Sequence, residues 1–362
     1  MKDKIQEVCR AFRIRGEFLG YKEIKRGHIN QTYRADFIRD DGKRKSYIVQ
    51  AINTEVFHKP VEVMDNIDLV TEYLHAKMPG KTVLHFHHTK DRLTWWENET
   101  GFWRLFNFIP SYTYDASTDP QVLRSAGRAF GEFQTLLSDF DANRLHETIP
   151  HFHDTIQRYE NLEDAIASDP LGRLAEVQEE AAWLRSVKDT ACRLTTMHQA
   201  GELPLRVTHN DTKINNVLFD ESGREAIVVI DLDTVMPGLV GHDFGDAIRF
   251  AANTAEEDCK DLKKVAVDLD LYRAFAEGFL SMTGKSLTQE EKDTLAVSCV
   301  CMTVEVALRF LEDYLRGDVY FRISYPQHNL DRARCQIALA KSMLTHMDEM
   351  EQIVAECLRE LA

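Results

Sequence analysis

The chain has 362 residues, of which 44% are hydrophobic and 28% are charged, and its formal net charge is −15. This length and composition predict an ordinary globular protein with two or three domains, or one large two-lobed enzyme. The acidic balance argues against a nucleic-acid-binding protein, because the overall charge does not attract a phosphate backbone. An anionic nucleotide would need a local cluster of basic residues.

Seven scattered cysteines predict reduced, buried thiols in a cytoplasmic protein. The N-terminus has no apolar segment typical of a signal peptide. No apolar run approaches the length needed to span a bilayer, so we expect no membrane partner. The sequence does not determine the oligomeric state, and we expect a monomer.

The first third of the chain is predicted to be rich in strands. A short amphipathic helix is expected at 4–13 and a longer helix at 61–77. Strand-like segments are predicted at 23–25, 27–33, 34–38, 46–52, 83–87, 93–96 and 102–109. A hinge is expected at Pro110. We therefore predict an N-lobe at 1–109, built on a nucleotide-binding β-sheet with a helix.

From Pro120 onward the pattern becomes helical. Apolar residues at spacings of three and four predict helices at 120–138, 156–167, 174–200, 243–251, 258–281, 288–316 and 329–360. A strand–loop–strand segment at 205–231 interrupts them. The predicted fold is α+β, bilobal and protein kinase-like, with a helical C-lobe at 110–362 that carries the catalytic loop and the acceptor site.

The most informative segment is His209-Asn210-Asp211-Thr212-Lys213-Ile214-Asn215-Asn216, followed after a hydrophobic strand by Asp231. This is the spacing of a phosphoryl-transfer catalytic loop. Asp211 is the candidate general base and Lys213 the candidate partner of the γ-phosphate. Asn216 and Asp231 offer the oxygen ligands that magnesium prefers. The alternative, a polar loop with Asx turns, would produce this pattern only by coincidence.

Two nearby segments depart from the protein kinase pattern. Asp243-Phe244-Gly245 spells a magnesium-binding triplet, but it lies 27 residues after Asn216. We therefore expect Asp243 to cap the next helix or to hold the catalytic loop. The third strand carries Gln50 where kinases carry a lysine, so the nucleotide phosphates lack that cation.

A late helix carries Glu305, Arg309 and Asp313 on one face, and spacing alone favours a salt-bridge ladder there. Tyr320 and Phe321 follow, and they can either stack on a sugar ring or belong to the core. The histidines at 85, 87, 88, 151 and 153 lack ligand spacing, so we expect hydrogen-bonded histidines and not a metal site.

The catalytic loop together with Ile230-Asp231 resembles the aminoglycoside phosphotransferase and choline kinase-like family. Further segments are similar to the N-acetylhexosamine 1-kinases within that family, and they spread over almost the whole chain: 27–30, 150–155, 207–216, 230–238, 243–250, 317–321 and 325–330. In that group the third strand also ends in glutamine, so Gln50 is consistent with an active enzyme.

The resemblance implies ATP-dependent phosphorylation of the anomeric C1 hydroxyl of GlcNAc or GalNAc, giving the sugar 1-phosphate, with Asp211 as base. It implies Mg²⁺ on Asn216 and Asp231. The residues assigned to the sugar are His28, Asp211, Asp233, Arg309 and Tyr320. The residues assigned to the nucleotide are Gln50, Asn107, Phe108, Ile109 and Lys213.

Two other functions stay open. A related small-molecule kinase would act on an aminoglycoside, choline or another amino alcohol, although Arg309 at the acceptor site would oppose a cation. A non-catalytic nucleotide-binding protein is motivated by Gln50, but the joint presence of Asp211, Lys213, Asn216 and Asp231 argues against it.

Overall fold

A computed structural model of the chain describes residues 1–25 and 29–361. It contains two compact units. The first unit consists of Met1–Ser111, Asn143–Ile149 and Ile230–Met236, and the second consists of Tyr112–Ala142, Pro150–Val229 and Pro237–Ala362.

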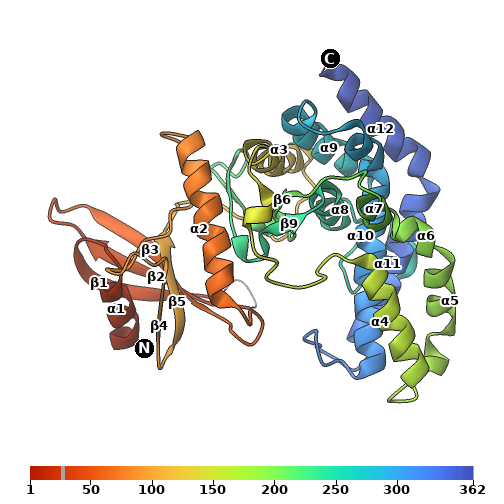
Figure 1. Cartoon of the computed structure of the whole chain (residues 1–362), viewed down its shortest axis with the longest axis horizontal. Coiled ribbons are helices and arrows are strands. Elements are labelled where there is room, and N and C mark those ends of the chain that lie inside the picture. The colour runs from red at the N-terminus through yellow and green to blue at the C-terminus, as the bar shows by residue number, and fades with distance from the viewer. Residues whose placement is uncertain (26–28, 362) are drawn as a thin grey trace. The chain divides into compact units, whose positions relative to one another are not determined.

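The first unit is built on a five-stranded antiparallel sheet in the order β1-β2-β3-β5-β4 (Figure 1). Its elements are α1 Lys2–Ala11, β1 Glu17–Ile24, β2 Gln31–Ile38, β3 Arg44–Ile52, α2 Pro60–Lys77, β4 Trp95–Asn98 and β5 Gly101–Asn107. The first strand is longer than the sequence predicted. The predicted strand at 83–87 forms only an isolated bridge between Phe86 and Phe106, made by two backbone hydrogen bonds of His85 and His87 to β5.

Alternation along the strands separates two faces of this sheet. On one face, Tyr47, Val49 and Leu105 form a core with Ile5 and Val8 of the amphipathic helix α1. We call it the α1 face. The register pairs Gln50 with Arg104, and both are offset by one position from the residues of that core. Gln50 and Arg104 therefore point to the opposite face.

The second unit is mostly helical. Its helices are α3 Pro120–Leu136, α4 Thr155–Ser168, α5 Gln178–Ser186, α6 Lys188–Ala191, α7 Arg193–Gln199, α8 Val240–Ala251, α9 Leu269–Thr283, α10 Gln289–Arg316, α11 His328–Thr345 and α12 Met347–Glu360. Short strands β6 Arg206–Thr208, β7 Val217–Phe219, β8 Ala226–Val229 and β9 Met236–Gly238 pair as β6-β9 and β7-β8. Single 3₁₀ turns occur at Ala142–Arg144, Leu174–Glu176, Ile214–Asn216, Leu232–Thr234 and Leu262–Lys264.

Three predicted helices differ from those in the structure. The segment at 174–200 is divided into three short helices, the one at 329–360 breaks at His346, and the one at 258–281 begins only at Leu269. The apolar spacing continues across these three breaks. Periodicity alone therefore could not locate them.

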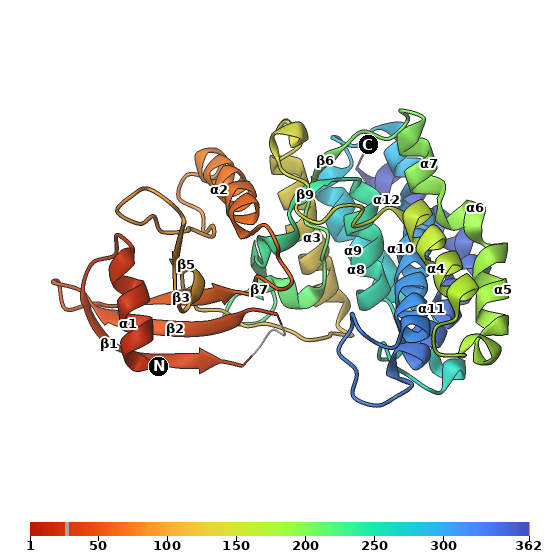
Figure 2. The same ribbon diagram turned by 60° about the horizontal axis from the view of Figure 1, so that its bottom comes forward.

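The long helix α10 lies at the centre of the second unit, in contact with α4, α8 and α11 (Figure 2). It starts with a capping box between Thr288 and Glu291 and ends at Gly317, whose φ of 103° suits a glycine. Among the described residues it is one helix that is long and apolar enough to cross a membrane, but 94% of its apolar window is buried inside the protein. The prediction that no apolar run approaches this length was wrong for α10, and its core position explains the composition.

Candidate active site

The predicted catalytic loop connects β6 to the 3₁₀ turn Ile214–Asn216 in the second unit. Asn210, directly before Asp211, has a left-handed backbone with φ 63°. Asparagine is one of the few non-glycine residue types that tolerate this conformation. The loop is therefore sharply turned just before the candidate base.

Asp211 faces both of its predicted neighbours. Its Oδ1 lies 2.9 Å from Lys213 Nζ, and its side chain is 27% exposed, so a substrate hydroxyl can reach it. Its Oδ2 accepts a hydrogen bond from Asn216 Nδ2 at 3.1 Å, and the same nitrogen donates to the Asp211 carbonyl at 2.8 Å. The structure thus brings together three residues that the motif spacing singled out.

The charges of this group are mutually stabilised. Burial opposes the ionisation of Asp211, but Lys213, His209 and Asn216 outweigh it and hold the pKa of Asp211 below its usual value. Burial likewise opposes the charge of Lys213, yet the carboxylates of Asp211 and Asp246 raise its pKa. At neutral pH the aspartate is therefore ionised and able to accept a proton, with a cation beside it.

Asn216 is oriented as a metal ligand would need to be. Both hydrogen bonds to Asp211 use its amide nitrogen, which leaves Oδ1 as the ligand atom. Among residues 1–25 and 29–361 there is no group of three His, Cys, Asp or Glu side chains that could hold a metal ion. Magnesium commonly binds through one or two protein oxygens together with substrate phosphates, and its assignment to Asn216 and Asp231 stays a prediction.

The hairpin of β7 and β8 connects Asn216 to Asp231 along the chain. Val217, directly after Asn216, pairs with Val229, the last residue of β8. Asp231 is exposed and has a left-handed backbone with φ 62°. Such a conformation costs roughly 1 kcal/mol and persists where the surrounding structure fixes it, often at functional sites.

Asp243 supports the catalytic loop from the first turn of α8. Its carboxylate accepts hydrogen bonds from the backbone nitrogens of His209 at 3.0 Å and Asn210 at 2.8 Å. It is completely buried, and Gln134 donates to it as well. The prediction that Asp243 holds the catalytic loop is confirmed. It does not cap the helix, because Leu239 occupies that position.

A buried acid–histidine pair, which the sequence did not reveal, also contacts the loop. Glu305 in α10 accepts a hydrogen bond from His153 Nδ1 at 2.8 Å, and His153 Nε2 lies 3.3 Å from the carbonyl oxygen of Asn210. Both ring nitrogens of His153 therefore lie within hydrogen-bond distance of an oxygen. Burial opposes the charge of Glu305, but His153 and the nearby Arg158 lower its pKa to about 2. This pair ties the backbone before Asp211 to the central helix.

The first unit carries a second buried polar network. Arg104 donates to Gln50 Oε1 at 2.6 and 2.8 Å and forms an ion pair with Asp233. Asn30 donates to the other Asp233 oxygen at 2.7 Å, and Gln50 donates to Thr32 at 2.9 Å. A cation therefore does stand beside Gln50, contributed by β5 instead of β3. The sequence analysis missed Arg104 altogether.

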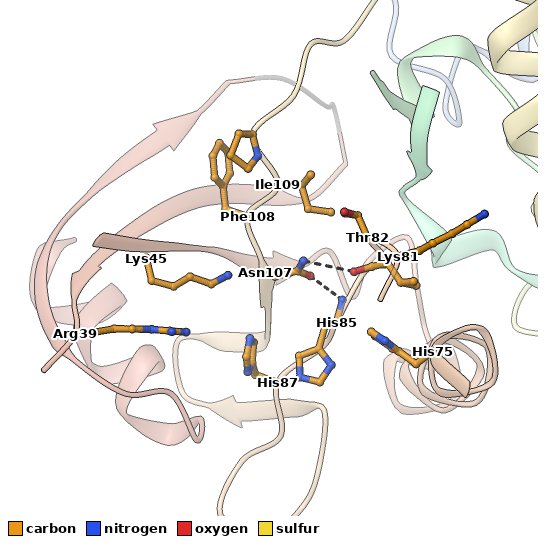
Figure 3. A pocket seen from close by; sticks show the side chains of 12 residues that line it. Arg39, Lys45, His75, Lys81, Thr82, His85, His87, Asn107, Phe108 and Ile109 are labelled. Atoms are coloured by element: carbon orange, nitrogen blue, oxygen red, sulfur yellow. Dashed lines mark hydrogen bonds between the residues drawn. The ribbon is translucent and has the colours of Figure 1, made fainter. Parts of the chain in front are cut away.

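The remaining residues assigned to the nucleotide lie at the end of β5. Asn107 accepts a hydrogen bond from the His85 backbone at 2.7 Å, and with Phe108 and Ile109 it lines a cavity of about 450 Å³ (Figure 3). Their assignment to the nucleotide stays a prediction. His28, assigned to the sugar, lies outside the described residues.

Two residues assigned to the sugar meet in the second unit. Arg309 Nη2 lies 3.4 Å from the Tyr320 hydroxyl, and its guanidinium lies within 6 Å of the rings of Phe152, Tyr320 and Phe321. Tyr320 is 67% exposed and Val319 is 78% exposed. The arrangement is an aromatic surface around one cation.

The loop that carries Tyr320 is fixed by Asp313. This buried carboxylate accepts hydrogen bonds from the backbone nitrogens of Val319, Tyr320 and Phe321 at 2.8 to 2.9 Å. The salt-bridge ladder favoured by spacing is therefore wrong. Glu305 pairs with His153, which is distant in the chain, and Asp313 binds the backbone of the loop that directly follows its own helix.

Comparisons with known proteins identify the family and the fold. A family model described as the phosphotransferase enzyme family matches residues 20–277. Among solved structures, an aminoglycoside phosphotransferase from Alicyclobacillus acidocaldarius is similar, with a TM-score of 0.64 and 13% identity over 97% of this chain and 96% of that one. An amicoumacin kinase in complex with AMP-PNP and Ca²⁺ has a TM-score of 0.60 and 13% identity, with 93% of this chain and 92% of that one covered. A choline kinase from Cryptosporidium parvum has a TM-score of 0.57 and 14% identity, with 99% of both chains covered.

The structural likenesses confirm the predicted α+β, kinase-like fold of the aminoglycoside phosphotransferase type. The family match includes the loop of Asp211, Lys213 and Asn216 and covers well over half of the chain. We conclude that this chain belongs to the phosphotransferase enzyme family.

Proposed function

We propose that this protein is a sugar 1-kinase that transfers the γ-phosphoryl group of ATP to the anomeric C1 hydroxyl of an N-acetylhexosamine, GlcNAc or GalNAc. The observation that carries the proposal is the group of Asp211, Lys213 and Asn216, in which an accessible carboxylate contacts a cation and a neutral amide. Phosphoryl transfer needs little more from a protein than positioning and charge stabilisation of this kind.

In the proposed reaction the sugar hydroxyl donates its proton to Asp211 while its oxygen attacks the γ-phosphorus, and ADP leaves. Lys213 has a second role. While it is paired with Asp211, it keeps the pKa of that carboxyl low and the base weak. When Lys213 turns to the phosphate charge, Asp211 loses this partner, its pKa rises, and it becomes a better proton acceptor.

Asn216 and Asp231 would hold magnesium, which neutralises charge on the phosphates of ATP. The AMP-PNP and Ca²⁺ bound in the amicoumacin kinase support a nucleotide with a divalent cation in this fold. We assign the nucleotide to the lobe at 1–109 and the acceptor to the lobe at 110–362. Gln50, Asn107, Phe108, Ile109 and Lys213 remain our candidates for nucleotide contacts.

The acceptor assignment rests on the resemblance to N-acetylhexosamine 1-kinases and on the surface around Arg309. A sugar offers a weakly polar face that stacks on an aromatic ring such as Tyr320, and hydroxyl or acyl oxygens that accept from a guanidinium. His28 and Asp233 stay predicted sugar contacts. Both Asp233 oxygens already accept hydrogen bonds, so any sugar contact there has to be shared.

The competing acceptor is a cationic amino alcohol or aminoglycoside, which the choline kinase and aminoglycoside phosphotransferase likenesses favour. Aromatic rings bind such cations. Here, however, Arg309 already lies within 6 Å of the three rings and would repel a second cation. We therefore rank the sugar first.

An acceptor screen separates the two functions. The purified protein is incubated with Mg²⁺ and labelled ATP, and with GlcNAc, GalNAc, choline, ethanolamine or an aminoglycoside in parallel. We expect phosphate transfer to the hexosamines only, and ³¹P NMR of the product should place the phosphate on C1. Transfer to a cationic acceptor without transfer to any hexosamine would replace the first function with the second.

A further inference from the structure

The first unit contains an open cavity of about 450 Å³, and three of its lining residues, Asn107, Phe108 and Ile109, are also our candidates for nucleotide contacts. Arg39, Lys45, His85, His87 and Asn107 line it on the polar side, and Phe108 and Ile109 belong to its apolar wall. Figure 3 shows the Arg39 and Lys45 side chains extending from one side toward Asn107 and His87. We call it the basic cavity.

Strand alternation assigns the basic cavity to one face of the sheet. Lys45 lies two residues before Tyr47, and Asn107 lies opposite Tyr47 in the register of β3 and β5, so both point to the α1 face. Gln50, Arg104 and the Asp233 carboxylate that Arg104 binds belong to the opposite face. The cavity is therefore separated by the sheet from the polar network around Gln50.

The cavity wall has one sign of charge. Its lining includes arginine, lysine and histidine side chains and no aspartate or glutamate. Within the described part of the chain, Arg39 and Lys45 form no ion pair. In a concave site lined by one sign of charge, the field attracts ions of the opposite sign. This wall is complementary to an anion.

One buried nitrogen atom in the cavity wall also lacks a hydrogen-bond partner. Nε2 of His87 is buried and makes no hydrogen bond, although its ring packs edge-on against His85 and Tyr47. A buried polar atom without a hydrogen bond needs an explanation, such as a water, an ion or another ligand. Burial, followed by His85, Lys45, His88 and Arg39, lowers the pKa of His87 to about 4. The imidazole is thus neutral at pH 7, in surroundings that are already positive.

We propose that the basic cavity is a binding site for a small organic phosphate, on the face of the sheet opposite the polar network around Gln50. Its phosphate group is held by Arg39 and Lys45 and accepts a hydrogen bond from His87. Its apolar body lies against Phe108 and Ile109. A volume of about 450 Å³ is in the range of small-molecule sites and exceeds what a bare phosphate ion fills.

Binding of phenyl phosphate tests this site, with inorganic phosphate as the second probe. The measurement is titration calorimetry of the full chain in a Lys213→Ala background, which weakens binding of phosphate at the catalytic loop. The test variant is Arg39→Ala with Lys45→Ala. The matched control is Lys43→Ala with Arg44→Ala, which removes the same two charges from the same hairpin outside the cavity.

We expect the test variant to weaken phenyl phosphate binding by about tenfold or more, equivalent to at least ~1.4 kcal/mol, and the control by less than about twofold. Inorganic phosphate should bind more weakly than phenyl phosphate, because it lacks the apolar body. The ¹⁵N imidazole resonance of His87, assigned with His87→Gln, should shift with phenyl phosphate.

Equal weakening in both charge variants, or no binding by the background protein at about 10 mM probe, would overturn the proposal. Equal affinity for the two probes would remove the role of the apolar wall. A raised KM for ATP in Arg39→Ala/Lys45→Ala, with Lys213 intact, would reassign the cavity to the nucleotide. Failure of the sugar screen would leave this site untouched, because its test does not depend on turnover.

Discussion

The two units hold their key carboxylates in different ways. In the first unit, Asp233 is buried, and its oxygens accept from Arg104 and Asn30. In the second unit, Asp211 is 27% exposed, and its cationic partner is a flexible lysine. The first arrangement fixes a side chain in place, whereas the second leaves one accessible to a substrate.

This difference separates a structural carboxylate from a reactive one. A buried ion pair is costly to break, because removing one partner strands a charge in a poorly solvated place. An accessible ion pair contributes little to stability, so its partners can be exchanged during a reaction. We therefore expect substitutions in the first unit to change folding and substitutions at the loop to change turnover.

The largest expected effect is on turnover. Asp211→Asn should lower kcat by about 10³-fold, because general-base catalysis contributes roughly 10² to 10⁴. The free energy of unfolding should change by less than about 1 kcal/mol. Both are measured on one preparation, by ATP consumption with the best acceptor and by urea unfolding.

The matched control is Glu221→Gln, which removes one exposed negative charge from the turn between β7 and β8. It should leave both quantities near the values of the unsubstituted protein. Turnover of Asp211→Asn within about tenfold of the unsubstituted enzyme would contradict its role as base, since the expected range begins near 10².

Folding should respond next most strongly. Arg104→Met should lower the free energy of unfolding by about 3 to 5 kcal/mol, because it leaves Asp233 buried without its cation. In the double variant Arg104→Met/Asp233→Leu the loss should be smaller than the sum of the single losses. Urea unfolding at pH 7 measures all three.

A surface ion pair provides the comparison for Arg104. Arg124 pairs with Glu277 at 2.6 Å, but their side chains are 43% and 27% exposed. Arg124→Met should cost less than about 1 kcal/mol. If Arg104→Met and Arg124→Met lowered the free energy of unfolding by the same amount, burial would not distinguish the two ion pairs. The contrast between a fixed and an accessible carboxylate would then be wrong.

Glu305 combines both behaviours, since it is buried in α10 and supports the catalytic loop. Its pKa is lowered from 4.5 to about 2 in the folded protein. The stability it contributes is therefore present above pH 4.5 and is lost as the pH falls toward 2. A difference of this size corresponds to about 3 kcal/mol.

Glu305→Gln should accordingly have a lower free energy of unfolding than the unsubstituted protein at pH 7. The difference between the two proteins should become smaller between pH 4.5 and 2. Urea unfolding at several pH values measures it. Burial lowers the pKa of His242 to about 3, and Glu305 opposes this shift. The two proteins are therefore compared above that pKa, where folded His242 is neutral in both and its contribution cancels. Glu163→Gln is the control, because Glu163 forms an exposed ion pair with Arg185. Its free energy of unfolding should differ little from that of the unsubstituted protein. A difference between Glu305→Gln and the unsubstituted protein that stayed constant from pH 7 to pH 3 would contradict the assignment.

The sequence predicted what short stretches of chain determine. Asp211, Lys213 and Asn216 lie within six residues of one another, so their contacts follow from a single tight loop. The amphipathic face of α1 and the alternation of β2 and β3 likewise follow from local spacing. This is why the fold class and the core of the site were accessible without a structure.

The supporting contacts were not accessible, because they join residues far apart in the chain. His153 and Glu305 are 152 positions apart, and Arg104 and Asp233 are 129 apart. Tertiary contacts of this kind leave no spacing to recognise. One local signal was available: a glutamate at the centre of an apolar helix such as α10 must find a partner when it is buried.

The smallest predicted effect concerns acceptor binding. Tyr320→Ala should raise the KM for the acceptor by about tenfold and leave kcat within about twofold, because an aromatic stacking contact contributes roughly 0.5 to 1.5 kcal/mol. Val319→Ala, at the more exposed neighbouring position, should leave both constants unchanged. Steady-state kinetics with varied acceptor at saturating ATP separates the two constants. A lower kcat with an unchanged KM would instead place Tyr320 among the groups that act in the transition state. The aromatic surface would then belong with Asp211 on the reactive side of the comparison.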